Sequence, residues 1–323
     1  MLNLELAKEV HGKSVLVTGA AGFIGSRLVE ILDVLGAKVI AVDALLESTY
    51  SAETKRLRWK KMKSNLSSNT KFQEIDLRDL IEVQKLPGVE IIYNLAAMPG
   101  LEKSWLDFEM YLSCNVTVTN NLITYSKDKK IGRFVQASTS SVYGTYATGN
   151  EESLLRPSSP YGVTKLAAEN LILAHSQNSG FSYSILRYFS VFGPNQRPDM
   201  AFSIFAKQIL NDLPITIYGN GSQTRSNTYI DDVVITTIIA GFNPHFQDQI
   251  LNVCGNSELS ISSAVEIIAT ALNKAPKVIY GPERPGDQQR TCGDNSKLAG
   301  IIDVSNFGNI SELLAGCITG FER

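Results

Sequence analysis

Two side chains that can share a proton stand four residues apart near the middle of the chain. Tyr161 and Lys165 belong to the segment Tyr-Gly-Val-Thr-Lys, which follows Pro160 directly. If a helix begins at this proline, residues four apart lie on one face, a turn from each other. The ammonium then favours the ionised phenol and lowers the tyrosine pKa from about 10 toward neutrality, so that Tyr161 becomes a usable general base. Such pairs more often belong to a solvated helix face, so a catalytic interpretation requires a nucleotide site elsewhere in the chain.

A glycine loop near the N-terminus predicts that nucleotide site. Residues 14–17 have the apolar pattern of a buried strand, and they run into Gly19, Gly22 and Gly25, which open a helical pattern ending near Leu35. Glycines here permit a tight turn, close approach of backbone to a pyrophosphate and close helix packing. The spacing G-x-x-G-x-x-G differs from the commoner G-x-G-x-x-G, but strand and helix flank it as required. The predicted cofactor-binding residues of the loop are Gly19, Gly22, Phe23, Ile24 and Gly25.

The second predicted strand ends in an acidic residue. Residues 38–42 are mostly apolar and lead to Asp43, about twenty residues beyond the glycine loop. A carboxylate at this position accepts hydrogen bonds from the adenosine ribose hydroxyls and repels a 2′-phosphate. The sequence therefore predicts NAD, rather than NADP, as the cofactor.

The elements that must position these groups alternate along the first half of the chain. Strand patterns at residues 71–75, 91–95 and 133–137 are separated by helical patterns, which is typical of a doubly wound parallel sheet. Ligands of such sheets bind at the carboxyl edge, where the residues after each strand gather. We therefore predict further cofactor contacts from Asp76, Leu77, Leu95, Ala96 and Ala97.

Composition narrows the range of partners. The 323 residues include 30 basic and 32 acidic side chains, so nucleic acid is not expected as a partner. A local basic run at residues 55–63 is interpreted as the solvated face of a helix. The four cysteines and three histidines are scattered, which predicts neither a metal site nor a disulfide framework and favours a cytoplasmic location. No apolar run reaches the roughly 18 residues of a membrane span, and the first ten residues do not resemble a secretion signal.

Four segments together resemble one enzyme family. Residues 18–25, 94–97, 138–144 and 161–165 are similar to the motifs of the extended short-chain dehydrogenases/reductases, in particular the nucleotide-sugar epimerases and dehydratases. The resemblance spans nearly the whole chain. It implies a Rossmann sheet that binds NAD and a smaller C-terminal lobe that binds a UDP-sugar.

The resemblance also implies three catalytic residues. Thr139 and Tyr161 would hydrogen-bond one sugar hydroxyl, Tyr161 would remove its proton, and Lys165 would bond the nicotinamide ribose while holding Tyr161 ionised. In this family the sugar is oxidised at C4, turns about its diphosphate linkage and is reduced on its other face, so there is no net redox change. The presence of all three side chains predicts an active enzyme.

Two arginines in the second half of the chain suit a diphosphate. Arg225 follows a glycine-rich turn and Arg284 lies in a separate loop, and each guanidinium can grip phosphate oxygens bidentately. On residue type alone, each would more often be a surface arginine. The resemblance assigns both, with Asp287, to substrate binding, although Asn227 and Thr228 stand where the family usually has Asp-Phe.

The hydroxyl-rich segment bears on the reaction type. Family dehydratases carry Asp-Glu, and the UDP-glucuronate decarboxylases carry Glu, where this chain has Ser140 and Ser141. A hydroxyl cannot serve as a carboxylate acid or base at neutral pH. The sequence therefore disfavours elimination and predicts redox epimerisation, with Ser140 and Ser141 near the substrate.

Three further segments resemble the UDP-glucuronate 4-epimerase branch of the family. They are residues 96–100, 104–105 and 196–200, and in that branch the arginine corresponding to Arg197 would pair with the sugar carboxylate. Ser190 stands where that branch has Thr and neutral-sugar epimerases have Asn. Because Ser, like Thr, carries a hydroxyl, this position favours a uronate substrate. The predicted reaction is the interconversion of UDP-glucuronate and UDP-galacturonate.

Three alternatives stay open at this point. The first is a 4-epimerase of a neutral sugar, UDP-glucose or UDP-N-acetylglucosamine, in which Arg197 only stabilises its loop. The second is UDP-glucuronate decarboxylation or dehydration. The third is a catalytically silent NAD-binding regulatory protein, against which the intact Thr139, Tyr161 and Lys165 argue.

The expected architecture is an α/β fold with two parts. Residues 1–180 should form an NAD-binding Rossmann domain, and residues 181–323 mainly a UDP-sugar-binding lobe with segments crossing back to the sheet. The apolar faces of residues 105–127 and 161–175 are expected to form the four-helix contact of a homodimer.

Overall fold

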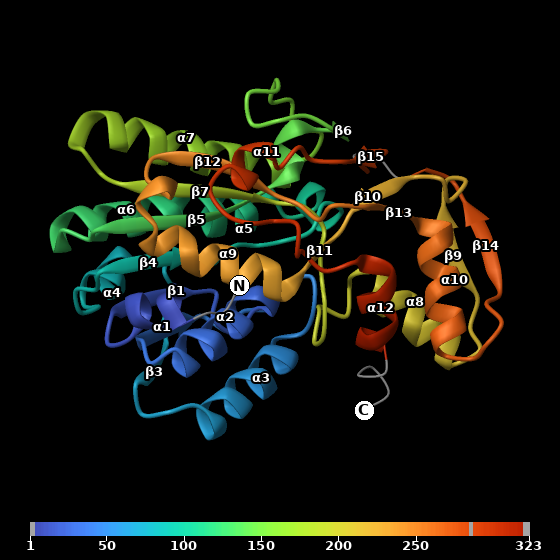
Figure 1. The fold of residues 1–323 in the computed structure, drawn as a ribbon, viewed down its shortest axis with the longest axis horizontal. Helices are drawn as coiled ribbons and strands as arrows, with labels where there is room; N and C mark the ends of the chain where they lie inside the picture. The colour runs from blue at the N-terminus through green and yellow to red at the C-terminus, as the bar shows by residue number, and fades with distance from the viewer. Residues whose placement is uncertain (1–3, 284–286, 319–323) are drawn as a thin grey trace. The chain divides into compact units, whose positions relative to one another are not determined.

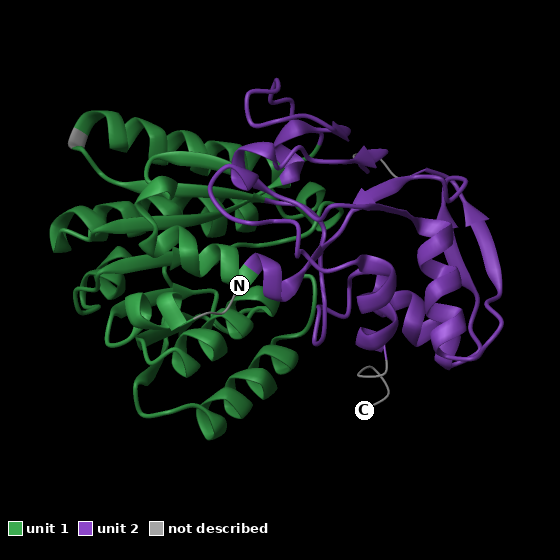
Figure 2. Cartoon of the chain, in the orientation of Figure 1, with its two compact units in different colours: residues 1–139, 159–187, 234–251 green, residues 140–158, 188–233, 252–323 purple. Residues whose placement is uncertain are grey.

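A computed structural model describes residues 4–283 and 287–318, and its helices and strands are labelled in Figure 1. The chain divides into two compact units, coloured separately in Figure 2. Unit 1 comprises residues 1–139, 159–187 and 234–251, and unit 2 comprises residues 140–158, 188–233 and 252–323. Each unit therefore takes segments from both halves of the chain.

A seven-stranded sheet forms the centre of unit 1. Its strands lie in the order β12-β7-β5-β4-β1-β2-β3, and the neighbours from β5 to β3 are paired in parallel. This order confirms the predicted doubly wound α/β fold. The strands are β1 (Ser14–Thr18), β2 (Lys38–Asp43), β3 (Thr70–Glu74), β4 (Ile91–Asn94), β5 (Arg133–Thr139), β7 (Tyr183–Tyr188) and β12 (Gln249–Val253).

The order of the strands switches direction at β1 and β4. These two strands are paired in register, so that Thr18 and Asn94 end side by side. Open α/β sheets bind ligands at the carboxyl edge beside such a switch point. The glycine loop follows Thr18 directly, which places it at this edge.

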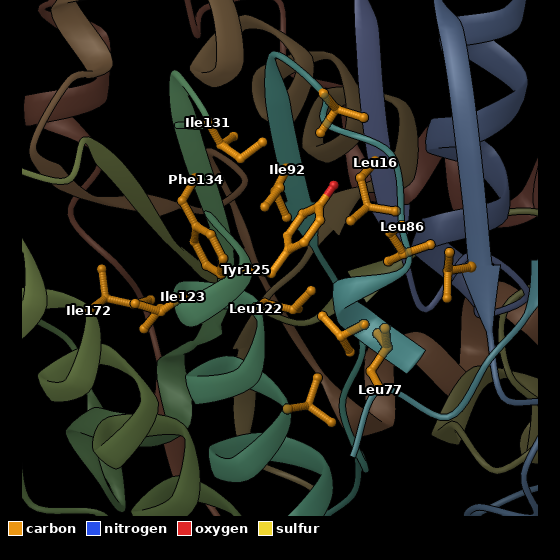
Figure 3. Packing of buried hydrophobic residues seen from close by; sticks show 14 of the residues in the cluster. Leu16, Leu77, Leu86, Ile92, Leu122, Ile123, Tyr125, Ile131, Phe134 and Ile172 are labelled. Carbon is orange, nitrogen blue, oxygen red and sulfur yellow. The ribbon is translucent and has the colours of Figure 1, made fainter. Parts of the chain in front are cut away.

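One face of the sheet carries the main core of unit 1. Helices α4 (Leu80–Gln84), α6 (Val118–Lys129) and α7 (Pro160–Ser179) contribute to it. Figure 3 shows Leu122 and Tyr125 of α6 packed with Ile92 and Phe134 of the strands, and all four side chains are fully buried. Burying such a side chain stabilises the fold by about 1.5–3 kcal/mol. This packing holds α7 in a fixed position against the sheet.

The opposite face is covered by α2 (Phe23–Val34), α3 (Ala52–Asn65) and α9 (Ile230–Phe242). Tyr93 of β4 points to this side and donates a hydrogen bond to the Ile238 carbonyl oxygen at 3.1 Å. The remaining helical segments of unit 1 are α1 (Leu4–Val10), η1 (Lys103–Trp105), α5 (Phe108–Leu112), the π-helical turn η2 (Ser113–Thr117) and η4 (Pro244–Phe246). Within the described ranges, no helix is both long and apolar enough to cross a membrane.

Unit 2 has shorter strands and its own core. A four-stranded sheet has the order β13-β10-β15-β6, while β11 pairs with β8 and β14 with β9. Apolar side chains of three helices, α8, α10 and α12, pack with β9 to form the core. The elements are η3 (Ser140–Tyr143), β6 (Tyr146–Ala147), β8 (Val191–Phe192), α8 (Ala201–Leu210), β9 (Ile215–Tyr218), β10 (Thr224–Ser226), β11 (Thr228–Tyr229), β13 (Glu258–Ser260), α10 (Ile261–Ala271), β14 (Val278–Gly281), β15 (Arg290–Thr291), α11 (Ser296–Ala299) and α12 (Ile310–Ile318).

Candidate active site

The glycines at the junction of β1 and α2 leave no room for a Cβ atom. Gly19 has a φ of 65°, in the left-handed region, and a Cβ there would lie 2.7 Å from the Leu95 carbonyl oxygen. A Cβ at Gly25 would lie 2.2 Å from the Gly19 carbonyl oxygen. Helix α2 begins with Gly22 as its N-cap, and no side chain caps its first N–H groups. The loop therefore offers backbone N–H groups to an anion such as a pyrophosphate, and a dinucleotide fits the residues present.

The carboxylate at the end of β2 is buried and oriented by this loop. Asp43 is 8% exposed and accepts hydrogen bonds from the N–H groups of Ala21 at 3.0 Å and Leu45 at 2.8 Å. Burial raises the pKa of Asp43, while Lys55 and the two backbone donors oppose the shift. Each carboxylate oxygen keeps further acceptor capacity, so ribose hydroxyls can still be bound.

Most of the basic run on α3 is exposed, as predicted, but two of its side chains contact the backbone of other segments. Arg58 donates from Nη1 to the Ala21 carbonyl oxygen at 3.0 Å, and Lys55 donates to the Leu46 carbonyl oxygen at 2.9 Å. Both side chains are half-buried, whereas the other basic side chains of the run are exposed. Residues three apart on a helix share a face, and this spacing was the available signal. Arg58 thus braces the glycine loop.

The residues that follow β3 are held by hydrogen bonds from nearby side chains. Arg78 contacts the Asp76 carboxylate from Nε at 3.0 Å and from Nη2 at 2.6 Å, and this pairing lowers the pKa of Asp76. The side-chain amide of Asn121 donates to the Leu77 carbonyl oxygen at 3.0 Å. An adenine contact from Asp76 would therefore share the carboxylate with Arg78.

A ladder of buried polar side chains links the ends of three neighbouring strands. The Thr18 hydroxyl donates to the Asn94 side chain at 2.7 Å, and the Asn94 amide donates to Gln136 at 2.8 Å. Thr18 also accepts a bond from the Ala96 N–H at 3.1 Å, and Gln136 donates to the Ala137 carbonyl oxygen at 2.8 Å. Buried polar groups that satisfy one another rigidify a site, so the ladder fixes the glycine loop relative to the end of β5.

Helix α7 begins where the sequence predicts. Pro160 is its first residue, and the hydroxyl of the N-cap Ser159 accepts a hydrogen bond from the Gly162 N–H at 3.2 Å. Tyr161 therefore lies in the first turn of α7. The four-residue spacing to Lys165 places both side chains on one helix face, as predicted.

Lys165 is the buried cation of this region. It is 3% exposed and donates to the Ala137 carbonyl oxygen at 2.6 Å. Burial lowers the pKa of Lys165 to about 8, and Glu169 opposes the shift. Two residues further along β5, Thr139 ends the strand and is also buried. Lys165 thus contacts the strand that ends in Thr139, and Tyr161 lies one turn before Lys165 on α7.

A buried amide beside α7 was missed from the sequence. Asn115 lies in the π-helical turn η2, where it accepts a bond from the Met98 N–H at 2.7 Å and donates to the Thr164 hydroxyl at 3.0 Å. Nearby, Tyr111 packs edge-on against Tyr161 with ring centroids 6.2 Å apart. The available signal was a break in the helical pattern after residue 113, because a π-helical turn shifts the 3.6-residue period and often marks a functional site.

Unit 2 contains a cavity of about 470 Å³, within the range of about 300–1,000 Å³ that is usual for small-molecule sites. Three predicted substrate residues, Ser190, Arg225 and Asp287, line it together. Burial lowers the pKa of Arg225, and Asp287 opposes the shift. Arg225 thus gives the cavity wall a half-buried guanidinium that can bind an anion, and the nearby Asp287 carboxylate partly offsets its charge.

Arg197 lies next to this cavity without lining it. Its Nε and Nη2 donate to the two oxygens of Asp199 at 3.0 and 2.9 Å, and Asp199 does line the cavity. This arrangement leaves Nη1 without a hydrogen bond to any residue that the structure describes. The sequence did not predict that the arginine would already hold a carboxylate of its own loop.

Ser140 and Ser141 lie in the short helical turn η3 and are buried. The Gln288 side chain donates to the carbonyl oxygens of Ser140 at 3.3 Å and Gly144 at 2.9 Å, which fixes this turn. Neither serine lines the 470 Å³ cavity. The predicted contact Arg284 lies outside the described residues.

Each unit contains different features that an enzyme requires. Unit 1 offers an anion-suited glycine loop, a ribose-suited carboxylate and a buried Lys165 one turn from Tyr161, while unit 2 offers a cavity with an arginine. These features define an α/β enzyme that uses a dinucleotide cofactor.

Residues 15–254 match the model of a family described as the NAD dependent epimerase/dehydratase family. The chain belongs to this family. NAD is therefore its cofactor, as predicted from Asp43.

Relatives and a solved structure match most of the chain. A Bacillus subtilis protein described as the uncharacterized UDP-glucose epimerase YtcB is 38% identical over 301 residues, which cover 89% of this chain and 91% of that protein. The UDP-glucuronate 4-epimerase of Thermodesulfobacterium geofontis is 36% identical and covers 89% of this chain and 90% of its own. The crystal structure of UDP-glucuronic acid 4-epimerase from Bacillus cereus, in complex with UDP-glucuronic acid and NAD, has a TM-score of 0.89 at 35% identity, covering 96% of this chain and 99% of that one.

Proposed function

We propose that this NAD-dependent nucleotide-sugar 4-epimerase converts UDP-glucuronate to UDP-galacturonate. The observation that carries the choice of sugar is the Arg197 guanidinium beside the unit 2 cavity. Asp199 holds it by Nε and Nη2, so that the edge formed by Nη1 and Nη2 remains for a second carboxylate. The T. geofontis and B. cereus proteins, which are UDP-glucuronate 4-epimerases, support this assignment.

We assign the cofactor to the carboxyl edge of the unit 1 sheet. The glycine loop would bind the pyrophosphate, Asp43 the adenosine ribose, and Asp76 with Leu77 the adenine. When bound, NAD supplies reversible oxidation at C4 of the sugar. The proposed cofactor-binding residues are Gly19, Gly22, Phe23, Ile24, Gly25, Asp43, Asp76, Leu77, Leu95, Ala96, Ala97, Tyr161 and Lys165.

Three residues would handle the proton of the C4 hydroxyl. Thr139 and Tyr161 would hydrogen-bond the hydroxyl, and the ionised Tyr161 would accept its proton. Lys165 is buried and its ammonium is held by the Ala137 carbonyl oxygen, so its charge stays close to the first turn of α7. A positive charge fixed there favours the phenolate over the phenol.

The nucleotide part of the substrate would occupy unit 2. Arg225 would hold the diphosphate in the cavity, with Arg284 as a further contact, while Asp287 would accept hydrogen bonds from substrate hydroxyls and Ser190 would face the sugar. Ser140 and Ser141 would approach the sugar without a carboxylate. Because elimination and decarboxylation need an acid or base at these positions, their absence supports epimerisation.

A neutral sugar is the second candidate, and one observation favours it. The Arg197–Asp199 pair is complete in itself, so UDP-glucose or UDP-N-acetylglucosamine would leave the pair undisturbed. The B. subtilis relative is described as a UDP-glucose epimerase. A neutral-sugar enzyme would therefore use Arg197 only to hold its loop.

The test is to incubate the purified protein with NAD and UDP-glucuronate, UDP-glucose or UDP-N-acetylglucosamine in parallel, and to identify products by chromatography and NMR. We expect UDP-galacturonate as the main product, and Arg197→Ala should lose this activity while leaving any neutral-sugar activity unchanged. Arg290→Ala is the matched control, because Arg290 grips Glu258 through Nε and Nη2 in the same way and does not line the 470 Å³ cavity. Dominant conversion of a neutral sugar would overturn the uronate assignment, and release of CO2 would indicate a decarboxylase.

We further propose a cytoplasmic homodimer. Trp105, Leu106, Phe108 and Leu112 of η1, α5 and the loop between them expose apolar side chains, as does Val163 of α7. Such a concentration of exposed apolar side chains suits an interface with a second copy. The four cysteines are free thiols, which suits a reducing compartment. Sedimentation of the NAD-loaded protein tests the oligomeric state.

A further inference from the structure

A buried carboxylate lies one turn beyond Lys165 on α7. Glu169 is 1% exposed and forms a two-pronged ion pair with Arg187 of β7, with Nη2 at 2.8 Å from Oε2 and Nε at 3.1 Å from Oε1. The hydroxyl of Ser138 on β5 donates a short hydrogen bond to the same carboxylate. One side chain of α7 thus binds two neighbouring strands of the unit 1 sheet.

The residue that Glu169 grips on β5 is flanked by two residues of the candidate active site. Ser138 follows Ala137, whose carbonyl oxygen accepts the Lys165 ammonium at 2.6 Å, and it precedes Thr139. Because these three residues are consecutive in a strand, a shift of Ser138 moves both neighbours. Glu169 therefore controls how far β5 lies from the helix that carries Tyr161 and Lys165.

Stability alone does not require this ion pair. Replacing a buried ion pair with well-packed apolar side chains is often neutral or stabilising, because taking two charges out of water is costly. Glu169 and Arg187 are both almost fully buried, with side-chain exposures of 1% and 2%. A positioning or electrostatic role would explain why a carboxylate is buried at position 169 despite the free-energy cost of removing it from water.

The charges around Lys165 come from few elements. Its own helix carries Tyr161 and Glu169. Strand β7 carries Arg187, which forms an ion pair with Glu169. The elements packed against α7 are η1, α5, η2, α6 and β5. Their titratable groups are Lys103 on η1, Glu109 and Tyr111 on α5, Cys114 on η2, Tyr125, Lys127, Asp128 and Lys129 on α6, and Arg133 on β5, and of these Tyr111 packs against Tyr161. Lys103 is bonded to the Ser48 carbonyl oxygen, Lys127 contacts His175 at the exposed side, and burial raises the pKa of Cys114. Glu169 is the partner that sustains the charge of Lys165.

We propose that Glu169 is a positioning residue of the epimerase, which fixes Lys165 and Thr139 relative to Tyr161 and sustains the positive charge of Lys165. The inference rests on the proposed roles of Tyr161 and Lys165, but it holds for either a uronate or a neutral sugar. Removing the carboxylate should lower kcat, because small displacements of catalytic groups cost on the order of 10²-fold in rate. KM for the UDP-sugar should stay within about threefold, since Glu169 binds no substrate.

The electrostatic role of Glu169 predicts the direction in which its removal shifts the pH profile. Removing a buried negative charge lowers the proton affinity of every group nearby. In Glu169→Gln, both limbs of the pH profile of kcat should therefore move to lower pH, by about one unit or more. In Glu169→Gln/Arg187→Gln the net charge of the cluster is unchanged, so the limbs should move back toward the wild-type positions while kcat stays low.

The positioning role of Glu169 is tested by a separate variant. Ser138→Ala removes the hydroxyl that Glu169 grips and changes no charge. It should lower kcat about tenfold without moving the pH profile. Glu266→Gln is the matched control, because it removes an exposed carboxylate from α10 in unit 2 and should change neither kcat nor the profile.

The measurements are kcat, KM and pH profiles with whichever UDP-sugar the wild-type enzyme converts, alongside NAD content and Tm. A second readout needs no substrate: the tyrosinate absorbance of the NAD-loaded protein is titrated with pH, with Tyr161→Phe as the subtraction. A lower titration midpoint in Glu169→Gln supports the proposal even if UDP-glucuronate is not the substrate. If Glu169→Gln does not fold, the double variant and Ser138→Ala decide. Wild-type kcat and unshifted midpoints in the variants that fold would overturn the proposal.

Discussion

The polar groups of the two units are held in different ways. In unit 1, Lys165, Glu169 and Asn94 are almost completely buried, and each forms a hydrogen bond with a residue of β5. In unit 2, Arg225 on the short strand β10 is half-buried, and the side chain of Arg197, in the loop before α8, is 21% exposed. If the proposed roles are right, the reacting groups lie in a core, whereas the groups that select the substrate are more exposed.

This contrast makes different kinds of variant informative in the two units. A change in unit 1 should act on the rate of the chemical step, because the affected groups are fixed before substrate arrives. A change in unit 2 should act on substrate affinity, because the arginines are proposed to contact parts of the substrate that do not react.

The largest expected effect is that of Tyr161→Phe. Tyr161 is the proposed general base, so its loss should lower kcat by about 10²- to 10⁴-fold, while Tm stays near wild type. Tyr280→Phe is the control, because Tyr280 is exposed and lies on β14 of unit 2. Steady-state kinetics by product chromatography measure the loss. A variant that kept a tenth or more of wild-type kcat would show that another group removes the proton.

A smaller effect of the opposite kind is expected from Arg225→Ala. Hydrogen bonds to charged groups contribute about 1.5–3 kcal/mol, so KM for the UDP-sugar should rise by about 10- to 150-fold with little change in kcat. Burial lowers the pKa of Arg225, but a guanidinium stays charged at neutral pH, so the effect should not depend on pH near 7. A loss of kcat at unchanged KM would contradict the division of roles between the units.

The local elements of unit 1 follow from the sequence. The apolar run at residues 14–17, the glycines after it and Pro160 before Tyr161 each act within a few residues, and β1, α2 and α7 lie where these patterns predict. The carboxyl edge of the sheet then gathers Gly19, Leu95 and Ala137 without further information, because parallel strands end together.

The contacts between distant segments could not be predicted in the same way. Glu169 meets Ser138 and Arg187, and Asn115 meets Met98, only because strands and helices pack side by side. A buried Glu or Arg has the same letter in the sequence as a solvated one, and only its neighbours in space decide. The Arg197–Asp199 pair is local, yet its spacing of two carries no regular pattern outside secondary structure, so it too was visible only in the structure.

The next effect tests the rigidity of the unit 1 loop. In Gly25→Ala the new Cβ would lie 2.2 Å from the Gly19 carbonyl oxygen, so the loop must shift. We expect NAD affinity to fall about tenfold or more and Tm to fall, since overpacking costs about 1–3 kcal/mol. Gly316→Ala on α12 is the matched control, because no atom lies within 4 Å of its added Cβ and alanine favours a helix. Calorimetric titration with NAD distinguishes the two, and equal affinities in both variants would refute the close fit of the loop.

The smallest effect concerns an exposed ion pair of unit 2. Arg290 lowers the pKa of Glu258 to about 2, and the usual value of this carboxyl is 4.5. A carboxyl with a lowered pKa contributes stability above its unfolded pKa, and this contribution is lost as pH falls from about 4.5 toward 2. Glu258→Gln should therefore have a slightly lower Tm than wild type at pH 7, and the two should converge near pH 2. Asp43 of unit 1 has the opposite sign, since burial raises its pKa and ionisation opposes its burial. Scanning calorimetry across this range measures the difference, and a gap that widened as pH fell would show that the exposed pair does not stabilise unit 2.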